Sequence, residues 1–186
     1  MNAVLPWSET RARLRADGAR LRLLSAPALD GWSLYLCLPF LCVLLHRLAH
    51  HAHRNGWPRC GRVWWHLNTV LTGADISALA DLGPGLVIPH PMGVAIAGRA
   101  GRNFTVMACA GLGGEFGRRE DVGAGPGLPV LGDDVWLQPH CGVMGPVRVG
   151  SRVRVGAGLP VACDVNDDCD VTWPPPRIVR RAGDGA

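Results

Sequence analysis

The chain has 186 residues, of which 48% are apolar, so it fits one domain with a substantial core. Gly (25) and Pro (15) are abundant and aromatic residues make up only 6%, which is typical of thin, repetitive layers. The formal net charge is only +4, and all nineteen basic residues are Arg. Because these arginines are dispersed along the chain, we expect no nucleic-acid partner.

The first 24 residues are polar and rich in Arg, and they contain no apolar run of the kind that opens a secretory signal. The seven cysteines form no Cys-x-x-Cys pair. We therefore expect free thiols in a cytoplasmic protein. Ser8 to Leu24 has helical composition, with Ser8 as a capping residue and leucines on one face, and Ala26-Pro27 ends it.

Residues 32–48 form a strongly apolar segment. Its uncharged stretch, Gly31 to Leu45, is shorter than the roughly 20 residues that span a bilayer, and Pro39 interrupts it. We interpret the segment as a buried or membrane-surface helix. A peripheral contact between 32–48 and a membrane stays open at this point, because Arg and His flank the end of the segment.

Four histidines follow at positions 46, 50, 51 and 53, and the first two are one helical turn apart. A metal site is one interpretation, but no Asp or Glu lies near enough in the sequence to complete it. The pattern favours an ordinary polar helix end, and we predict no metal. Asn55 to Pro58 predicts a turn and Val63 to Leu71 a short helix, so residues 1–73 form a helical N-terminal region.

A six-residue period begins at Ile76. The sixes ISALAD, LGPGLV, IPHPMG and VAIAGR, and later those from Leu131 to Asn166, all start with Ile, Leu or Val, and most continue with a small residue. This period predicts a parallel β-helix over residues 74–166, in which each six supplies a short strand and a turn. A β-sandwich is the alternative, but its strands alternate with period two and would not hold this phase.

The period is interrupted at 115–129, which is polar and rich in Gly and predicts a loop projecting from one corner of the prism. After Asn166, residues 167–186 form a C-terminal tail. The run Trp173 to Pro176 in this tail predicts an extended segment that caps the final coil.

His90 stands on this repetitive scaffold fifteen residues after Asp75. An alcohol that attacks a thioester must lose its proton in the transition state, and an imidazole with an ordinary pKa near 6.5 suits that task. A carboxylate on the other ring nitrogen would fix the tautomer and stabilise the imidazolium. We therefore identify His90 as a candidate general base and Asp75 as its partner. A packed corner histidine and a capping aspartate are the structural alternatives.

The same residues carry a family resemblance over roughly 46–180. The matching elements are Asp75-Ile76, His90-Pro91-x-Gly93, Leu112-Gly113-Gly114, the loop, the hexads and the closing Pro-x-Arg177-Ile178-Val179. They resemble serine acetyltransferase, closest to short members with a reduced helical N-terminus. The resemblance implies a left-handed parallel β-helix, mainly β, assembled as a homotrimer or a dimer of trimers with sites between adjacent prisms. It also implies transfer of acetyl from acetyl-CoA to a hydroxyl, with His90 as base and Asp75 as orienting carboxylate.

The resemblance assigns the co-substrate contacts as well. Gly113 and Gly114 align with backbone that lines the acceptor and thioester region, where an amide N–H can face the developing oxyanion. Gly156 and Ala157 match the slot for the pantetheine arm, and Arg177 could meet the phosphates of CoA. No permanently bound cofactor is implied.

Several positions depart from the family pattern. Pro89 stands where an Asp helps to bind the serine amino group, and Gly127 and Leu128 stand near where an Arg-His pair clasps the serine carboxylate. Gln138 to Cys141 replaces a small Gly-Ala run in the CoA groove, and Trp173-Pro174 replaces a Gly-containing turn.

The sequence thus predicts an acetyl-CoA-dependent O-acetyltransferase acting on L-serine, or on a serine-like or sugar hydroxyl. Two alternatives stay open. One is a polysaccharide or natural-product O-acyltransferase that does not use free serine. The other is a catalytically degenerate β-helix that acts as a binding or scaffold protein.

Overall fold

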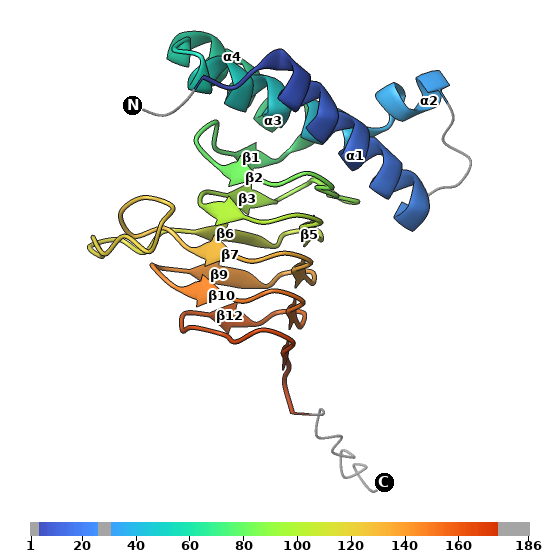
Figure 1. Ribbon diagram of the computed structural model, residues 1–186. Helices are drawn as coiled ribbons and strands as arrows, with labels where there is room; N and C mark the ends of the chain where they lie inside the picture. Colours follow the sequence, from blue (N-terminus) through green and yellow to red (C-terminus); the bar gives the residue numbers. More distant parts are fainter. Residues whose placement is uncertain (1–3, 26–30, 175–186) are drawn as a thin grey trace, which may run out of the picture.

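The computed structural model describes residues 4–25 and 31–174. A triangular prism of stacked coils carries a layer of helices across one end, a loop projects from its side, and the chain leaves at the opposite end (Figure 1). The predicted left-handed parallel β-helix, preceded by a helical N-terminal region, is confirmed.

The helical layer contains two long helices and two shorter ones. Pro39 and Pro58 lie at the starts of α3 and α4, where a missing backbone N–H costs nothing. The apolar segment 32–48 is therefore two helices, broken at Cys37, and not one. None of the helices in the described chain is long and apolar enough to cross a membrane. The bounds are α1 (Trp7–Ser25), α2 (Gly31–Leu36), α3 (Leu38–Arg54) and α4 (Pro58–Thr72).

The prism has three parallel sheets, one for each side, and every strand pairs with a strand of the next coil. The first sheet contains β1 (Asp75–Ile76), β3 (Ala95–Ile96), β6 (Gly111–Gly113), β9 (Gly142–Met144) and β12 (Pro160–Val161). The second contains β2 (Asp81–Leu82), β4 (Arg99–Ala100), β7 (Val130–Leu131) and β10 (Arg148–Val149). The third contains β5 (Thr105–Val106), β8 (Trp136–Leu137), β11 (Arg154–Val155) and β13 (Asp170–Val171). Because β13 pairs with β11, the coils continue beyond the predicted boundary at 166.

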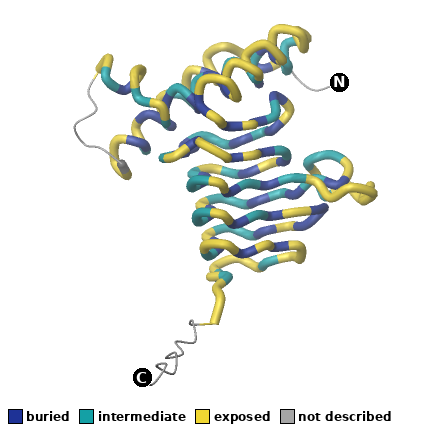
Figure 2. Tube along the Cα trace, turned by 180° about the vertical axis from the view of Figure 1, so that it is seen from behind, coloured by how far each residue is buried: buried dark blue, intermediate teal, exposed yellow. Residues whose placement is uncertain are grey.

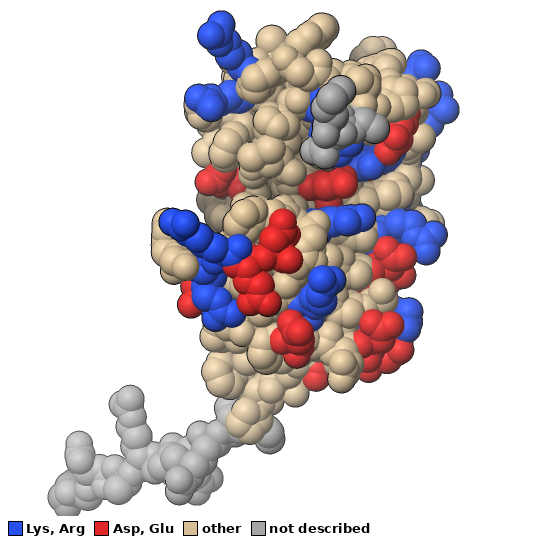
Figure 3. Space-filling model, turned by 60° about the vertical axis from the view of Figure 1, so that its left-hand side comes forward, with Lys and Arg blue, Asp and Glu red and all other residues tan. Residues whose placement is uncertain are grey.

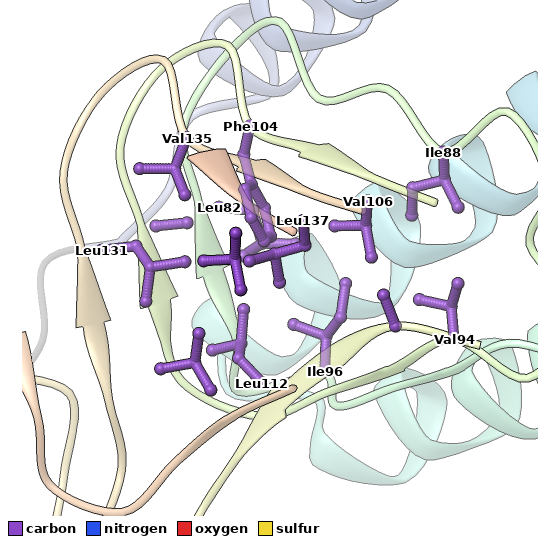
Figure 4. Close-up of a cluster of buried hydrophobic side chains, with 14 of the residues drawn as sticks. Leu82, Ile88, Val94, Ile96, Phe104, Val106, Leu112, Leu131, Val135 and Leu137 are labelled. Carbon is purple, nitrogen blue, oxygen red and sulfur yellow. The ribbon is translucent and has the colours of Figure 1, made fainter. Parts of the chain in front are cut away.

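The aliphatic residue of each six points into the prism. Leu82, Val106 and Leu137 have no exposed surface, and they meet Phe104, the one ring of the cluster, at its centre (Figure 4). Buried and exposed residues alternate along each coil (Figure 2), as expected where one face of every short strand lines the core.

One coil departs from the predicted phase. Ile96, and not Val94, takes the strand position next to Ile76 and Leu112. Ile76 pairs with Ile96 twenty residues later, and Ile96 pairs with Leu112 sixteen residues later, whereas Leu131 and Val149 are eighteen apart. The corner that contains His90 therefore holds two extra residues, and the next corner two fewer. The hexad count missed this because Val94 and Ile96 are both aliphatic and both buried.

A buried ion pair attaches the helical layer to the prism. Arg47 on α3 donates to both carboxylate oxygens of Asp17 on α1, at 2.9 and 3.0 Å, and each side chain is only 1% exposed. Asp17 also accepts the backbone N–H groups of Gly85 and Leu86, at 2.8 and 2.7 Å. Arg47 in turn donates to the carbonyl of Gly83 at 2.7 Å. The pair thus joins two helices to the first turn of the prism.

The interpretation of the histidines as a polar helix end is wrong for two of them. His46 and His50 are 0% and 2% exposed, because α3 packs against α1 and α4 and its His50 Nδ1 lies 3.1 Å from the Ala78 carbonyl oxygen of the prism. Burial lowers the pKa of His46 well below 6.5 and that of His50 to about 4, so both rings are neutral. Among the described residues, no three His, Cys, Asp or Glu side chains are grouped as metal ligands.

Candidate active site

Asp75 lies on β1, where the prism meets the helical layer. Its backbone N–H donates to the carbonyl of Val94 at 2.8 Å, so the start of β1 lies directly beside the chain that leaves the His90 corner. Its side chain is held from the other direction, since Trp65 Nε1–H on α4 donates to Asp75 Oδ1 at 2.7 Å. The second carboxylate oxygen keeps its capacity to accept a further hydrogen bond.

His90 lies on the widened corner and is exposed. Pro89 and Pro91 restrict the backbone on both sides of it, and Gly93 N–H anchors the corner to the carbonyl of Gly73 at 3.0 Å. Within the described part of the chain, no hydrogen bond joins the His90 ring to Asp75. It is therefore the backbone that brings the two segments together.

Two shallow cavities lie along the outer face of the first sheet. One of about 230 Å³ is lined by Trp65 and Asp75. The other, of about 300 Å³, is lined by Gly113 and Gly114. Both linings include Ala95, Leu112 and Gly113, so Asp75 and the two predicted backbone contacts share one continuous face. A Cβ at Gly113 would meet nothing within 4 Å, so the outer surface above this glycine is open.

The other predicted co-substrate contacts lie elsewhere. Gly156 and Ala157 belong to the turn between β11 and β12 and line neither of these cavities. A Cβ at the neighbouring Gly158 would lie 3.9 Å from Trp173 Nε1, so the indole covers this turn. Arg177 lies outside the described residues. Within one chain, the structure does not bring Gly156 and Ala157 together with Gly113.

The run Gln138 to Cys141, which departs from the family pattern, also contains a residue with a rare backbone conformation. His140 is exposed and adopts φ 61°, a left-handed conformation that side chains rarely take. In the turns of two other coils on the same corner the residue with this conformation is glycine, Gly93 at φ 73° and Gly158 at φ 72°. In the coil before His140 this position is taken by Cys109 at φ 56°, so two neighbouring coils carry a side chain at this corner.

The loop between β6 and β7 is organised by its own hydrogen bonds. Asp121 accepts the N–H groups of Gly123 and Gly125, at 2.7 and 3.0 Å, and these bonds lower the pKa of its carboxyl. Arg118 lies between Glu115 and Glu120, at 3.9 and 3.7 Å. On this side of the molecule acidic and basic side chains lie next to one another and not in separate fields (Figure 3).

Gly127 is required by this loop. It has φ 75°, and a Cβ there would lie 2.6 Å from the carbonyl oxygen of Arg118. A residue with a side chain cannot take this position without moving the loop. The next residue, Leu128, packs toward Gly114, with its Cδ2 3.3 Å from the Cβ position of that glycine. Neither position presents a charged group to an acceptor.

Sequence reasoning did not identify Trp65. The available signal was the pair Trp64-Trp65 near the beginning of the predicted short helix, with Trp65 ten residues before Asp75. Adjacent residues of a helix point in different directions, so the two indoles cannot both pack against the other helices. One of them could therefore contact the prism.

Comparisons with known proteins match this architecture. Residues 129–159 match the family model of the bacterial transferase hexapeptide (six repeats). A serine acetyltransferase of Synechococcus elongatus is 34% identical over 162 residues, which are 84% of this chain and 63% of that protein. The chain thus spans less than two thirds of that relative's length. A serine acetyltransferase of Helicobacter pylori is 33% identical over 144 residues, which are 74% of this chain and 80% of that protein.

Solved structures agree with the sequence relatives. The serine acetyltransferase of Neisseria gonorrhoeae in complex with serine superposes with a TM-score of 0.76 at 27% identity. The match covers 90% of this chain and 68% of that one. The identity to relatives, the matched repeat and the shared architecture lead to one conclusion, that this chain belongs to the serine acetyltransferase family.

Proposed function

We propose that the chain is an acyltransferase that moves the acetyl group of acetyl-CoA to the hydroxyl of a small acceptor. The observation that carries the proposal is the hydrogen bond between Asp75 N–H and the Val94 carbonyl, which sets the carboxylate beside the corner that presents His90. Membership in the serine acetyltransferase family supports the reaction type. The match spans 63% and 62% of the length of two of these relatives.

In this mechanism His90 accepts the proton of the acceptor hydroxyl as its oxygen forms a bond to the thioester carbonyl carbon. Backbone N–H groups at Gly113 and Gly114 face the oxyanion of the tetrahedral intermediate. The C–S bond then breaks, and the imidazolium returns the proton to the sulfur of CoA. Asp75 stabilises the imidazolium between these steps. No side chain becomes acylated, since the transfer is direct.

Trp65 acts as a positioning residue. Its indole N–H donates to one carboxylate oxygen of Asp75 at 2.7 Å, and the other oxygen can still accept a hydrogen bond. A carboxylate that is already oriented by one hydrogen bond loses less conformational freedom when it binds the imidazole. Trp65 therefore links the orientation of the helical layer to that of the carboxylate.

We also propose that the working form is a homotrimer or a dimer of trimers, with each site between adjacent prisms. One face of α4 exposes five apolar side chains: Val63, Trp64, Leu67, Val70 and Leu71. The first sheet beside it is lined by small residues that let another chain approach closely. Asp75, Gly113 and Gly114 would then face Gly156 and Ala157 of a neighbouring copy. This arrangement would join the two groups of residues that lie apart in one chain.

L-Serine is the first candidate acceptor, since the relatives are serine acetyltransferases and one was solved with serine bound. A neutral hydroxyl compound, such as a sugar, is the second. The observation that favours the second is Gly127, whose backbone admits no side chain at the position expected to clasp a carboxylate. Pro89 likewise offers no charge to an amino group.

The test is release of CoA from acetyl-CoA, followed with a thiol reagent, in the presence of serine, homoserine and a set of sugars. His90→Ala and Asp75→Asn are each expected to lower kcat at least about 10²-fold. His53→Ala, which removes a partly exposed histidine on α3, is the matched control and should leave kcat unchanged. Equal rates for wild type and His90→Ala would contradict the proposed base.

Trp65→Phe keeps an aromatic ring but removes the indole N–H donor together with part of the ring system. A fall of roughly tenfold in kcat, with unchanged KM and an unchanged unfolding temperature, is expected for a positioning residue. A fall in kcat that is accompanied by a lower unfolding temperature would instead indicate a purely structural role. If the folded wild-type protein turned over no acceptor at all, the scaffold alternative would replace the acyltransferase.

A further inference from the structure

Ser77 is a polar residue beside Asp75 to which the proposed mechanism gives no role. It follows Asp75 by two residues, so the two side chains point to the same outer face of the first sheet. The cavity of about 230 Å³ that Asp75 lines is also lined by Ser77, which is half-buried there. Two residues of a strand span roughly 7 Å, so Ser77 lies within reach of a small molecule bound at the carboxylate.

The hydrogen bonds of Ser77 leave its hydroxyl proton unused. Ser77 Oγ accepts the backbone N–H of Leu79 at 3.2 Å, which closes the turn after β1. The backbone N–H of Ser77 donates to the Ile96 carbonyl at 2.9 Å, so the residue is fixed against the next coil. Within the described chain, the structure shows no hydrogen-bond acceptor for the Ser77 O–H. A hydroxyl carries one donor beside its lone pairs, and this donor is available to a molecule in the cavity.

The residues stacked beneath Ser77 are small. β1 pairs with β3, and β3 with β6, so equivalent positions of these coils form columns down the prism (Figure 1). Two columns run down the outer face, each with a polar residue first and small residues after it: Asp75, Ala95 and Gly111 in one, and Ser77, Ala97 and Gly113 in the other. Successive coils are about 4.8 Å apart, so Ser77 lies roughly 10 Å from Gly113. This separation leaves room for an acetyl acceptor at Ser77 and a thioester over Gly113.

The Ser77 donor discriminates between the groups that can stand next to the reacting hydroxyl. One oxygen of Asp75 is bonded to Trp65, and the proposed mechanism assigns the other to His90. Ser77 then supplies a neutral O–H, which an ammonium group cannot accept because it has no lone pair. A second hydroxyl has lone pairs and accepts it. In L-serine the carbon next to the reacting one carries an ammonium group, whereas in a vicinal diol it carries a hydroxyl.

We propose that Ser77 binds the acetyl acceptor and that this acceptor is a vicinal diol, the arrangement found in sugars and other polyols. The inference rests on the proposed function and names the substrate class for it. Ser77 O–H donates to the hydroxyl beside the one that becomes acetylated, while His90 takes the proton of the reacting hydroxyl. The hydrogen bond thereby fixes the reacting oxygen relative to the thioester over Gly113.

The test compares three acetyl acceptors that differ only in the group next to the reacting carbon. Ethane-1,2-diol carries a hydroxyl there, ethanolamine an ammonium group and ethanol a hydrogen atom. Release of CoA gives kcat/KM for each. After correction for its two equivalent hydroxyls, the diol should exceed ethanol by about three- to tenfold in the wild type, the contribution of one neutral hydrogen bond. Ser77→Ala should remove this preference and leave kcat/KM for ethanol unchanged.

Two further variants separate binding from a structural effect. Ser77→Thr keeps the hydroxyl and should keep the preference for the diol. Ser151→Ala is the matched control, because Ser151 Oγ also accepts a backbone N–H, from Asp133 at 3.1 Å, but lies at a different corner, between the second and third sheets. This control should leave the preference unchanged. The ratio of two acceptors also cancels any general loss of folded protein.

The outcomes distinguish this inference from the proposed function. A diol preference that Ser77→Ala leaves intact, in a protein whose turnover still depends on His90, would overturn the inference alone. A wild type that prefers ethanolamine to the diol would overturn it as well. So would a loss in Ser77→Ala that is as large with L-serine as with the diol, since that result assigns the donor to a carboxylate. If the wild type turned over no acceptor at all, the inference and the proposed function would fail together.

Discussion

The prism and the helical layer bury their polar groups in different ways. In the prism, backbone groups bond to the next coil, as where Thr105 N–H donates to the Val135 carbonyl at 2.9 Å, and the side chains inside are apolar, most of them aliphatic. The helical layer buries an ion pair, Asp17 with Arg47, and two neutral histidines. Many equivalent contacts therefore stabilise the coils, whereas a few particular charged side chains hold the helices on the prism.

The strongest test of this difference is Asp17→Asn. Arg47 would keep its guanidinium charge, buried against two carbonyl groups, without a carboxylate. We expect the free energy of unfolding to fall by about 3–5 kcal/mol, as measured by urea denaturation. The double variant Asp17→Leu/Arg47→Met, which buries no charge, should recover most of the loss. A loss below about 1 kcal/mol for Asp17→Asn would show that the charges do not hold the layer.

The corresponding change inside the prism is Leu137→Ala. Leu137 has no exposed surface and pairs with Val106 above and Val155 below. We expect a loss of about 3 kcal/mol from the removed methyl groups and the cavity. Hydrogen exchange should accelerate in β5, β8 and β11, while α1 and α3 keep their protection. Leu79→Ala, at an exposed corner leucine, is the control and should have little effect.

Low pH should destabilise the helical layer more than the prism, because the two buried histidines lie in that layer. Desolvation lowers the pKa of His50 from 6.5 to about 4, with Arg13 and Arg47 acting in the same direction and Asp81 opposing them. Desolvation also lowers the pKa of His46 well below 6.5. The unfolded chain then binds more protons below pH 6.5, so this stability is present above that pH and is lost as pH falls toward about 4. One pH unit below 6.5 the cost is about 1.4 kcal/mol for each histidine.

The measurement is the urea midpoint of the helical layer between pH 7 and pH 4, with helical circular dichroism as the signal. His50→Gln should flatten the lower part of this profile, since glutamine does not titrate. A profile that His50→Gln leaves unchanged would assign the acid sensitivity to other groups.

The smallest effect is expected at the surface of the coils. Arg102 and Asp133 pair at 3.0 Å with side chains that are 68% and 37% exposed. Water and salt screen such a pair, so Arg102→Ala should cost less than about 1 kcal/mol. The difference between Arg102→Ala and wild type should vanish in high salt. A cost similar to that of Asp17→Asn would contradict the distinction between the two regions.

The sequence predicted the two regions with unequal success, for a physical reason. The six-residue period predicts that residues such as Leu131 and Val149 are buried and stacked, because each coil packs against coils of the same kind. The partners in the helical layer have no period. Arg47 and Asp17 are thirty residues apart, and nothing in their spacing indicates that they meet beneath a turn at Gly85. The buried state of His50 was missed for the same reason.

The candidate site shows a similar division. His90 and Asp75 were identified from their chemistry and the family resemblance, and the roles of both remain predictions. Trp65 was missed, because its contact with Asp75 depends on the angle between α4 and the prism. The restriction at Gly127 could not be read from the sequence, since it comes from the carbonyl of Arg118 in the folded loop.

The widened His90 corner has a consequence for how such chains can change. The two residues gained between Ile76 and Ile96 are matched by the two that are missing before Leu112, so the frame is restored within a single coil. Insertions at a vertex are thus absorbed locally and do not disturb the stack beneath. A corner segment such as 89–93 can therefore be replaced by that of a relative, which changes the reactive side chain and leaves the coils unchanged.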